Sequence, residues 1–393
     1  MILQQSVLIV GAGPVGLSLA VALIRQGVSV EVFEALPELS AEIRASTFHP
    51  PTLEMFADWG VVENVLAAGQ TVDRLTYWER RTRTKIAEFN YSSIASDTPF
   101  PFRLQCPQSV LTRTLRPIVE ESPLARVHMA HELVAFEDVG THVETKFETP
   151  KGIVMVQGAY LCGTDGSKSV VRKQSGLTFE GKTYADRFLL IGTDLNLKPF
   201  FPEIGPVNYM YDPEEWVIIL HLPDVVRIVF RLREDEVAAE AMAETAVRQR
   251  ISRFLETEAD YNIKHVSNYN VHQRVAETFR VGRVLLAGDA AHINNPSGGM
   301  GMNSGIHDAY HLAPKLAAVL DGAEDALLDG YSQERHQVAM QMVQNYSDKN
   351  YRDLAAQSPA EREKRNAVMQ ETAVDPMKAR AYLLRASMLD ERI

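Results

Sequence analysis

The 393-residue sequence predicts an α/β fold in which a nucleotide-binding domain is interleaved with a β-sheet domain and followed by a helical C-terminal region. Three observations support this prediction. A glycine-rich motif between two apolar runs opens the chain, and a second glycine-rich block begins at Gly288. Long stretches of alternating apolar residues separate the two blocks, as expected for a sheet with one covered face.

The first motif has the order strand, glycine-rich turn, helix, strand and acidic residue. Strand-forming residues 7–10 precede the turn, a helical stretch reaches Gln26, and a second strand, Val28 to Phe33, ends at Glu34. In a Rossmann-type unit the glycines permit a tight turn, close approach of a pyrophosphate and close helix packing, and the acid binds the adenosine ribose. The order therefore predicts dinucleotide binding by Gly11, Gly13, Pro14, Val15, Gly16 and Glu34.

Residues 7–24 also form a mostly apolar run, which raises the alternative of a membrane span. Three glycines, Pro14 and Ser18 interrupt this run, and no second long apolar segment occurs. We therefore expect no membrane span.

The second block places an acidic residue between a strand and a glycine-rich turn. Residues 284–287 are typical of a strand, Gly288 and Asp289 follow, and a helix is expected from Ser304 to about Leu320. A carboxylate at a strand end can bind ribose or ribityl hydroxyls, and a glycine-rich turn into a helix presents N–H groups to negative charge. A simple NAD-dependent dehydrogenase would leave this block without a role.

The predicted domains are discontinuous. Residues 1–70, 100–183 and 272–322 form the nucleotide-binding domain, residues 71–99 and 184–271 form the sheet domain, and residues 323–393 form the helical C-terminal region. Within the sheet domain, Trp216 to Leu222 and Val225 to Leu232 show the clearest strand alternation.

Composition limits the partners and the location. The net charge of −11 argues against binding to nucleic acid. Cys106 and Cys162 have no paired spacing, which excludes a zinc framework and a dithiol redox pair and suits a reducing cytoplasm. Residues 1–5 lead directly into the first strand without the pattern of a leader. We expect a cytoplasmic protein without a bound metal.

Five separated motifs resemble the FAD-dependent aromatic hydroxylases of the para-hydroxybenzoate hydroxylase type. The motifs are Gly11–Gly16 with Glu34, Ile43–His49 leading into Thr52–Met55, Gln108–Leu115, Cys162–Arg172, and Gly282–His292 with its glycine-rich sequel. The resemblance implies FAD as the cofactor and NADH or NADPH as the co-substrate. It also implies O2-dependent hydroxylation of a small phenolic or N-heteroaromatic compound through a flavin hydroperoxide, by a monomer or homodimer.

The same resemblance assigns roles to individual residues around the cofactor. Arg44 is expected beside the pyrophosphate, Gln108 at the ribityl or phosphate region and the backbone of Leu133 at adenine. Asp165 is expected near FAD and the nicotinamide, and Asp289 at the ribityl chain. Four residues, Pro296, Gly301, Met302 and Asn303, are expected against the flavin ring. There a helix N-terminus stabilises negative charge by roughly 0.3–2 kcal/mol.

Candidate residues for the substrate side come from two parts of the sequence. His49 lies five positions after Arg44, where relatives place a substrate-side polar residue, so it is the candidate to hold or deprotonate a phenol. The alternative is a loop histidine that packs on flavin without proton chemistry. The predicted substrate-sheet residues are Tyr209, Tyr211, His221 and Arg231, and a register shift of one residue would reverse their faces. Epoxidation, oxidative decarboxylation and non-catalytic FAD binding are compatible with the same motifs.

Overall fold

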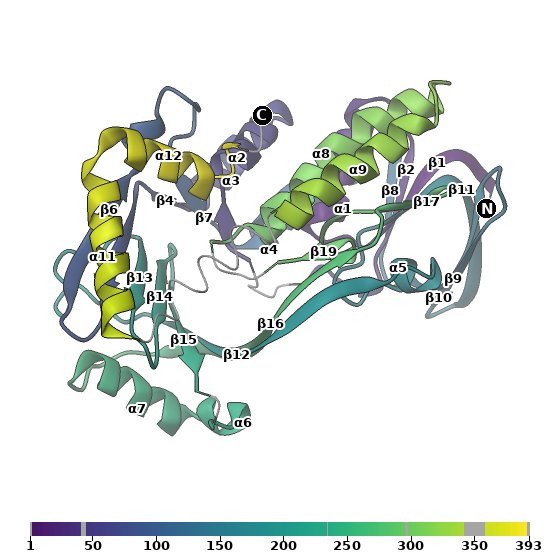
Figure 1. Ribbon diagram of the computed structural model, residues 1–393. Helices are drawn as coiled ribbons and strands as arrows, with labels where there is room; N and C mark the ends of the chain where they lie inside the picture. The colour runs from purple at the N-terminus through teal and green to yellow at the C-terminus, as the bar shows by residue number, and fades with distance from the viewer. Residues whose placement is uncertain (1, 41–44, 234, 295–297, 342–357, 391–393) are drawn as a thin grey trace.

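The computed structural model describes residues 2–40, 45–233, 235–294, 298–341 and 358–390. These residues form two interleaved units, each built on an eight-stranded sheet. Two long strands, β12 (Phe179–Thr193) and β16 (Ile263–Ala276), run from one unit into the other (Figure 1). The boundaries expected at residues 183/184 and 271/272 fall inside these strands, so the two units share continuous β-structure.

The first unit contains a parallel sheet that brings the predicted cofactor motifs to one edge. Its strand order is β17-β18-β11-β1-β2-β8, and β9 and β10 extend it from β11. The strands are β1 (Ile2–Val10), β2 (Val30–Phe33), β8 (Ala125–His128), β9 (Glu132–Asp138), β10 (Val143–Thr149), β11 (Gly152–Gly163), β17 (Arg280–Val281) and β18 (Val284–Leu286). Because β1, β2, β11 and β18 are parallel, their carboxyl ends meet at the same edge.

Helices cover this sheet. They are α1 (Pro14–Arg25), α2 (Pro50–Asp58), α3 (Val62–Ala67), α4 (Gln108–Glu121), α5 (Val170–Gln174), α8 (Gly301–Leu320) and α9 (Ala326–Gln341). Figure 1 shows α8 and α9 side by side above the parallel strands, with α1 next to them. Helix α8 begins three residues before the predicted Ser304, which brings Gly301 into its first turn.

The second unit is a mostly antiparallel sheet with the order β19-β16-β12-β15-β14-β13-β5-β6. Its remaining strands are β5 (Arg74–Glu79), β6 (Thr84–Asn90), β13 (Val207–Tyr211), β14 (Val217–His221), β15 (Val226–Leu232) and β19 (His292–Ile293). One face packs on α7 (Glu244–Leu255), with α6 (Ala238–Ala241) nearby. The other face, called here the inner face, packs on α12 (Pro376–Ala386), and α11 (Pro359–Val374) adjoins α12 and β6.

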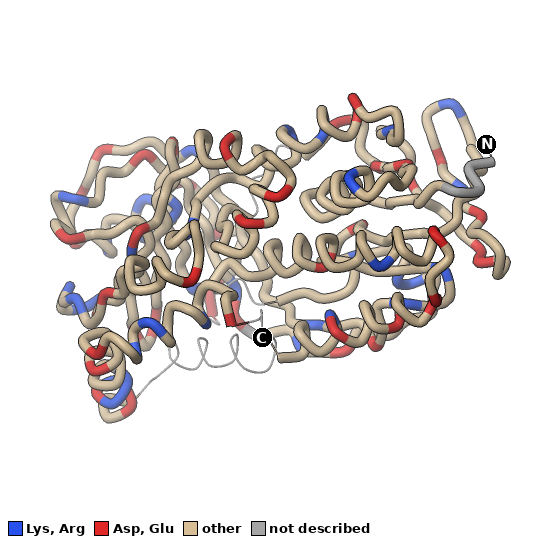
Figure 2. The backbone as a smooth tube through the Cα atoms, turned by 90° about the horizontal axis from the view of Figure 1, so that it is seen from above, with Lys and Arg blue, Asp and Glu red and all other residues tan. Residues whose placement is uncertain are grey.

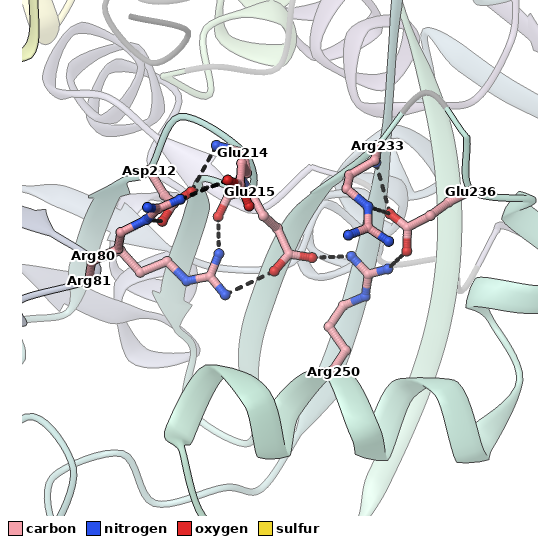
Figure 3. A network of polar contacts seen from close by, with 8 residues as sticks. All are labelled: Arg80, Arg81, Asp212, Glu214, Glu215, Arg233, Glu236 and Arg250. Carbon is pink, nitrogen blue, oxygen red and sulfur yellow. Dashed lines mark hydrogen bonds and ion pairs between the residues drawn. The ribbon is translucent and has the colours of Figure 1, made fainter. Parts of the chain in front are cut away.

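Ion pairs attach α7 to its face of the sheet (Figure 3). Arg250 on α7 is buried and pairs with Glu215 and Glu236. Arg80, at the end of β5, also pairs with Glu215 at 2.9 Å. Buried charges are costly unless paired, so this network fixes α7 in place and keeps that face of the sheet covered.

A three-stranded sheet joins the units. It contains β3 (Thr47–Phe48), β4 (Gln70–Val72) and β7 (Arg103–Gln105), in the order β3-β7-β4. Two short 3-10 helices, η1 (Tyr91–Ile94) and η2 (Gly288–Ala290), complete the described elements near the junction. Figure 2 shows Lys and Arg interspersed with Asp and Glu along both units. None of the described helices is both long enough and apolar enough to cross a bilayer.

Candidate active site

Two glycines of the first turn, Gly11 and Gly16, are required by close packing. Gly11 has a φ of +104°, and a Cβ placed there would lie 2.6 Å from the carbonyl oxygen of Thr164. A Cβ on Gly16 would lie 1.9 Å from the carbonyl oxygen of Gly11, whereas a Cβ on Gly13 would meet no atom within 4 Å. The backbone is thus tightly packed at Gly11 and Gly16 but has free space at Gly13, where a ligand can approach it.

Glu34 lies beside the same turn. It follows β2, and its Oε2 accepts a hydrogen bond of 2.8 Å from the backbone N–H of Ala12. This contact brings the carboxylate to the edge at which a nucleotide ribose is expected.

The two glycine-rich motifs meet in the structure, although they are far apart in the sequence. A Cβ on Gly288 would lie 2.8 Å from a methyl group of Val15, and a Cβ on Gly305 in α8 would lie 2.7 Å from the same methyl group. Helices α1 and α8 therefore pack closely at this point, and the exposed side chain of Asp289 lies at the edge that carries the first turn. These positions fit an extended cofactor that spans both motifs.

A buried ionic network supports the turn before Asp289. The carboxylate of Asp308 accepts from Gly288 N at 2.9 Å, contacts His292 Nε2 at 2.8 Å and accepts from Arg335 Nε at 2.7 Å. Burial opposes ionisation, but His292 and Arg335 overcome this effect and hold the pKa of Asp308 well below its ordinary value. Arg172 donates to the carbonyl of Ala290 at 2.7 Å, which fixes the turn from the other side.

The other predicted cofactor residues have clear local environments. Asp165 follows β11 and accepts hydrogen bonds from Val170 N at 2.7 Å and Val171 N at 3.2 Å, so its carboxylate caps α5. Gln108 begins α4, and its Oε1 accepts from Ala45 N at 3.4 Å. The side chain of Leu133 is buried in the core of the first unit. Arg44 and Pro296 lie outside the described residues.

The N-terminus of α8 points a set of backbone donors at the junction. The first α-helical bond of this helix runs from Ser304 N to Met300 O at 2.9 Å. The N–H groups of Gly301, Met302 and Asn303 therefore precede the helical hydrogen-bond ladder. Such donors fit the negative charge that a reduced flavin carries on its pyrimidine edge.

The side chain of Asn303 ties this helix to the segment around His49. Its Oδ1 accepts from His49 N at 2.9 Å and Thr52 Oγ1 at 2.7 Å. Its Nδ2 donates to the carbonyls of Thr47 at 2.8 Å and Gly299 at 2.7 Å. The family resemblance predicted a role for the backbone N–H of this residue. The structure shows in addition that its side-chain amide is fully buried and makes four hydrogen bonds.

His49 is completely buried between the second glycine-rich turn and the junction sheet. Its Nε2 lies 2.9 Å from the carbonyl oxygen of Gly298, and because a carbonyl only accepts, Nε2 carries the proton. Within the described part of the chain, Nδ1 has no hydrogen-bond partner. Burial, together with the nearby charge of Arg103, lowers the pKa of His49 well below 6.5. His49 is therefore a neutral imidazole whose Nδ1 can accept a hydrogen bond.

The inner face carries an aromatic surface that includes two predicted residues. Tyr209 stacks on Tyr77 with ring centroids 5.0 Å apart, and the hydroxyl of Tyr77 bonds that of Tyr382 on α12. Tyr211 lies on the same face, with the guanidinium of Arg365 3.8 Å from its ring centroid. Tyr209 and Tyr211 are thus brought together as expected from strand alternation.

The other two predicted substrate-sheet residues are placed differently. Arg231 is on the inner face but forms an ion pair with Asp186. His221 shares the alternation of Ile219, which packs in the core on the α7 side, so the structure does not bring it together with Tyr209. A shift of one residue along a strand reverses the face on which a side chain lies, and alternation in the sequence alone did not fix this shift.

Several residues at the junction had no signal in the sequence. Arg103, Tyr91 and Tyr77 are buried around the inner face, and Arg227 donates to Ser46 Oγ at 3.0 Å. Burial lowers the pKa of Arg227 to about 10. Their sequence neighbourhoods, such as Arg103-Leu104-Gln105, follow no recognisable binding pattern.

Comparisons with known proteins agree with this geometry. A protein family described as "FAD binding domain" matches residues 4–346. Para-nitrophenol 4-monooxygenase of Pseudomonas sp. is 31% identical over 392 residues, which cover 99% of this chain and 96% of that protein. The 6-hydroxy-3-succinoylpyridine 3-monooxygenase of Pseudomonas putida is 29% identical, and the match covers 92% of both chains.

Solved structures show the same similarity. The p-nitrophenol 4-monooxygenase PnpA of Pseudomonas putida superposes with a TM-score of 0.93 at 28% identity, over 99% of this chain and 98% of that one. The flavin-dependent monooxygenase PieE, solved with FAD and substrate, has a TM-score of 0.82 at 26% identity, over 99% of this chain and 72% of that one. FAD is therefore the cofactor, and the chain belongs to the FAD-binding family of flavin-dependent aromatic monooxygenases.

Proposed function

We propose that the protein hydroxylates a small phenolic substrate at the junction of the two units, with NADH or NADPH and O2 as co-substrates. The observation that carries the proposal is Nδ1 of His49, a buried acceptor without a hydrogen-bond partner among the described residues. It lies next to the second glycine-rich turn, through the bond of His49 to Gly298, and beside the aromatic inner face. The two relatives named above are monooxygenases of a nitrophenol and of a hydroxypyridine, which supports the same class of substrate.

FAD, when bound, supplies the activation of O2 and accepts reducing equivalents from the nicotinamide. The chain contributes binding and orientation. We propose that Gly13, Glu34 and Asp289 hold the polar spine of the cofactor, and that the first-turn N–H groups of α8 face its ring. The roles proposed for Arg44, Gln108, Leu133 and Asp165 are those that the family resemblance implies.

His49 is suited to hold the substrate hydroxyl. A phenol with a pKa near 10 is protonated at pH 7, and forming the phenolate there costs roughly 4 kcal/mol. Because Nε2–H donates to Gly298 O, the tautomer is fixed and Nδ1 is the acceptor for a phenol O–H. A hydrogen bond at this position draws electron density onto the ring, which favours its attack on an electrophilic oxygen.

The inner face provides the aromatic contact and excludes water. Tyr77, Tyr209 and Tyr211 are all buried there. We infer that the substrate ring packs against the rings of these tyrosines. Arg231, already paired with Asp186, and His221, on the other face, are not included in this proposed contact.

Both cysteines are free and buried, which supports the cytoplasmic location expected from the sequence. We propose a monomer or homodimer as the working assembly.

The test compares His49→Ala with wild type and with His142→Ala, a control in the β9–β10 turn. The measurements are FAD content, NAD(P)H oxidation, and hydroxylated product from a panel of phenols and hydroxypyridines. We expect His49→Ala to keep FAD and lose about 10²–10⁴-fold in product formation, with the electrons of NAD(P)H reducing O2 to hydrogen peroxide instead. His142→Ala should behave as wild type. Unchanged product per NAD(P)H in His49→Ala would refute the role of His49, and no product from any wild-type reaction would refute the proposed function.

A further inference from the structure

The C-terminal end of α12 is closed by a regular capping motif that contains an unusual residue. Leu389 N donates to the carbonyl of Leu384 at 3.0 Å, and Met388 N donates to the carbonyl of Arg385 at 3.1 Å. These two bonds define a Schellman motif, in which the residue after the cap has a left-handed backbone and is usually glycine. In this chain the residue is Met388, with a φ of +59°.

A methionine at this position strains the backbone, because a Cβ is unfavourable in the left-handed region. Four described residues other than glycine have a positive φ, namely Arg83, Ala130, Glu256 and Met388. Of these four, Met388 alone is buried, with 1% of its surface exposed. A strained conformation persists only where the surrounding structure fixes it, and such positions gather at functional sites. The contacts of the Met388 side chain therefore indicate why glycine is not used in this cap.

The side chain of Met388 reaches the second glycine-rich turn. With Met300 it forms a small apolar cluster, against which Val338 of α9 packs. Met300 is the N-cap residue of α8, and its side chain lies close to the turn, since a Cβ placed on Gly298 would be 3.6 Å from Met300 Cε. The carbonyl of Gly298 is the one that accepts from His49. A continuous set of contacts thus connects the C-terminal cap with the proposed substrate acceptor.

The same cap is also fixed to the inner face. Arg103 Nη2 donates to the carbonyl of Ala386 at 2.6 Å, so the junction sheet satisfies a carbonyl at the end of α12. Leu389 belongs to the apolar core of the inner face. Met388 therefore lies between two parts of the site, the wall of the inner face and the turn at which the flavin ring is expected.

We propose that Met388 is a positioning residue, which fixes the second glycine-rich turn, and with it the flavin ring, relative to the inner face. This inference rests on the proposed function and specifies how the chain keeps the flavin and the substrate in register. A misplacement of about 1 Å can lower a rate by about 100-fold. The flexible, apolar side chain of methionine suits an irregular gap between two such parts.

Two substitutions separate the side chain from the backbone strain. Met388→Ala and Met388→Gly both remove the contact with Met300, but only glycine also relieves the left-handed strain. Met388→Gly should therefore have a higher thermal midpoint than Met388→Ala. Both should lose the same share of the product formed per NAD(P)H, by up to about 100-fold. Met388→Leu keeps the apolar volume and should restore most of that product yield.

The absorption and fluorescence spectra of the bound, oxidised FAD provide a measurement without turnover. Met388→Ala and Met388→Gly should show the same spectral change, because both alter the surroundings of the flavin ring. Met300→Ala removes the same contact from its other side and should give a similar change. The double variant Met300→Ala/Met388→Ala should then differ little from either single variant, because residues that share one contact have non-additive effects.

Glu256 provides the matched control. It has the same left-handed backbone, with a φ of +60°, at the C-terminal end of α7 on the opposite face of the sheet. Its side chain is 73% exposed. Glu256→Gly should have a higher thermal midpoint than Glu256→Ala, and both should keep the wild-type product yield and flavin spectrum. This pair shows what relief of backbone strain does by itself.

Two results would overturn the inference. One is a product yield and a flavin spectrum that stay as in wild type in folded Met388→Ala and Met388→Gly. The other is a product yield that follows the thermal midpoint, with Met388→Gly close to wild type, because stability rather than the contact would then decide it. If Met388→Ala does not fold, Met388→Gly and Met300→Ala decide the matter. If wild type forms no hydroxylated product, the proposed function fails, and the flavin spectra alone decide on Met388.

Discussion

Asn303→Asp is the sharpest test of how the second glycine-rich turn is held. The amide of Asn303 accepts two hydrogen bonds through Oδ1 and donates two through Nδ2, to the carbonyls of Thr47 and Gly299. Aspartate has the same shape, but its second oxygen would face these two carbonyls at 2.7–2.8 Å. Both carbonyls would repel an ionised carboxylate, so the folded variant should hold the new carboxyl group in its protonated form.

The cost follows from protonation and from one lost donor. Keeping an aspartate neutral at pH 7, when its ordinary pKa is about 3.9, costs roughly 4 kcal/mol. A protonated carboxyl donates once rather than twice, and leaving one buried carbonyl unsatisfied costs about 1–3 kcal/mol. We expect Asn303→Asp to lower the free energy of unfolding by about 5 kcal/mol at pH 7. Because folding raises the pKa of the new carboxyl, its penalty shrinks as the pH falls, by about 2.7 kcal/mol between pH 7 and pH 5.

Asn208→Asp provides a matched control. Asn208 is also fully buried, but it lies on the α7 side and donates once, to Gly205 O at 2.7 Å. Urea unfolding at pH 5 and pH 7 should show a similar pH-dependent penalty in both variants. FAD titration by flavin fluorescence should show weakened binding only in Asn303→Asp. Equal FAD affinity in the two folded variants would refute the view that the Asn303 amide supports the flavin site.

Three further predictions concern the cofactor, the sheet and the effect of acid. Asp289→Ala should weaken FAD binding by about 5- to 150-fold, from the loss of about 1–3 kcal/mol, and full occupancy at limiting FAD would contradict this. Arg250→Met leaves Glu215 and Glu236 without their shared partner, so the free energy of unfolding should fall by about 3 kcal/mol in urea while the FAD affinity is unchanged. Folded His49 has a lowered pKa, so below about pH 6.5 the unfolded chain binds a proton that the folded chain does not, and stability falls as the pH falls. Urea unfolding at about pH 7 and pH 5.5 should show a smaller loss in His49→Gln than in wild type, and equal losses would show that His49 does not titrate in this way.

The cofactor side could be predicted from the sequence because its requirements are local. Gly11 and Gly16 are needed for a tight turn, and such a turn has the same spacing in any chain that forms it. The adjacency of Gly288 and Val15 could not be derived from spacing, since it depends on how α1 and α8 pack. Resemblance to the hydroxylases supplied that connection, and the described structure contains it.

The substrate side depends on strand register and on the opposite end of the chain. Alternation placed Tyr209 and Tyr211 on one face but could not separate His221 from them, because a shift of one residue along the strand reverses the face.

Asp165 shows a different limit of sequence-based prediction. Its motif indicates a cofactor role, yet the carboxylate also caps α5, and a sequence pattern does not reveal which hydrogen bonds a side chain will make.

The groups around Arg103 show why this part of the inner face could not be assembled from the sequence. They come from β5, η1, β13 and α12, and their residue numbers run from Tyr77 to Tyr382. Tyr382 reaches the cluster only because α12 packs on the inner face, where its helix also offers the Ala386 carbonyl to Arg103. The C-terminal helix is therefore part of the wall around the aromatic inner face. A change in its packing should alter the surface of the inner face, and with it the proposed contact to the substrate ring, while leaving the two glycine-rich motifs, and hence FAD binding, in place.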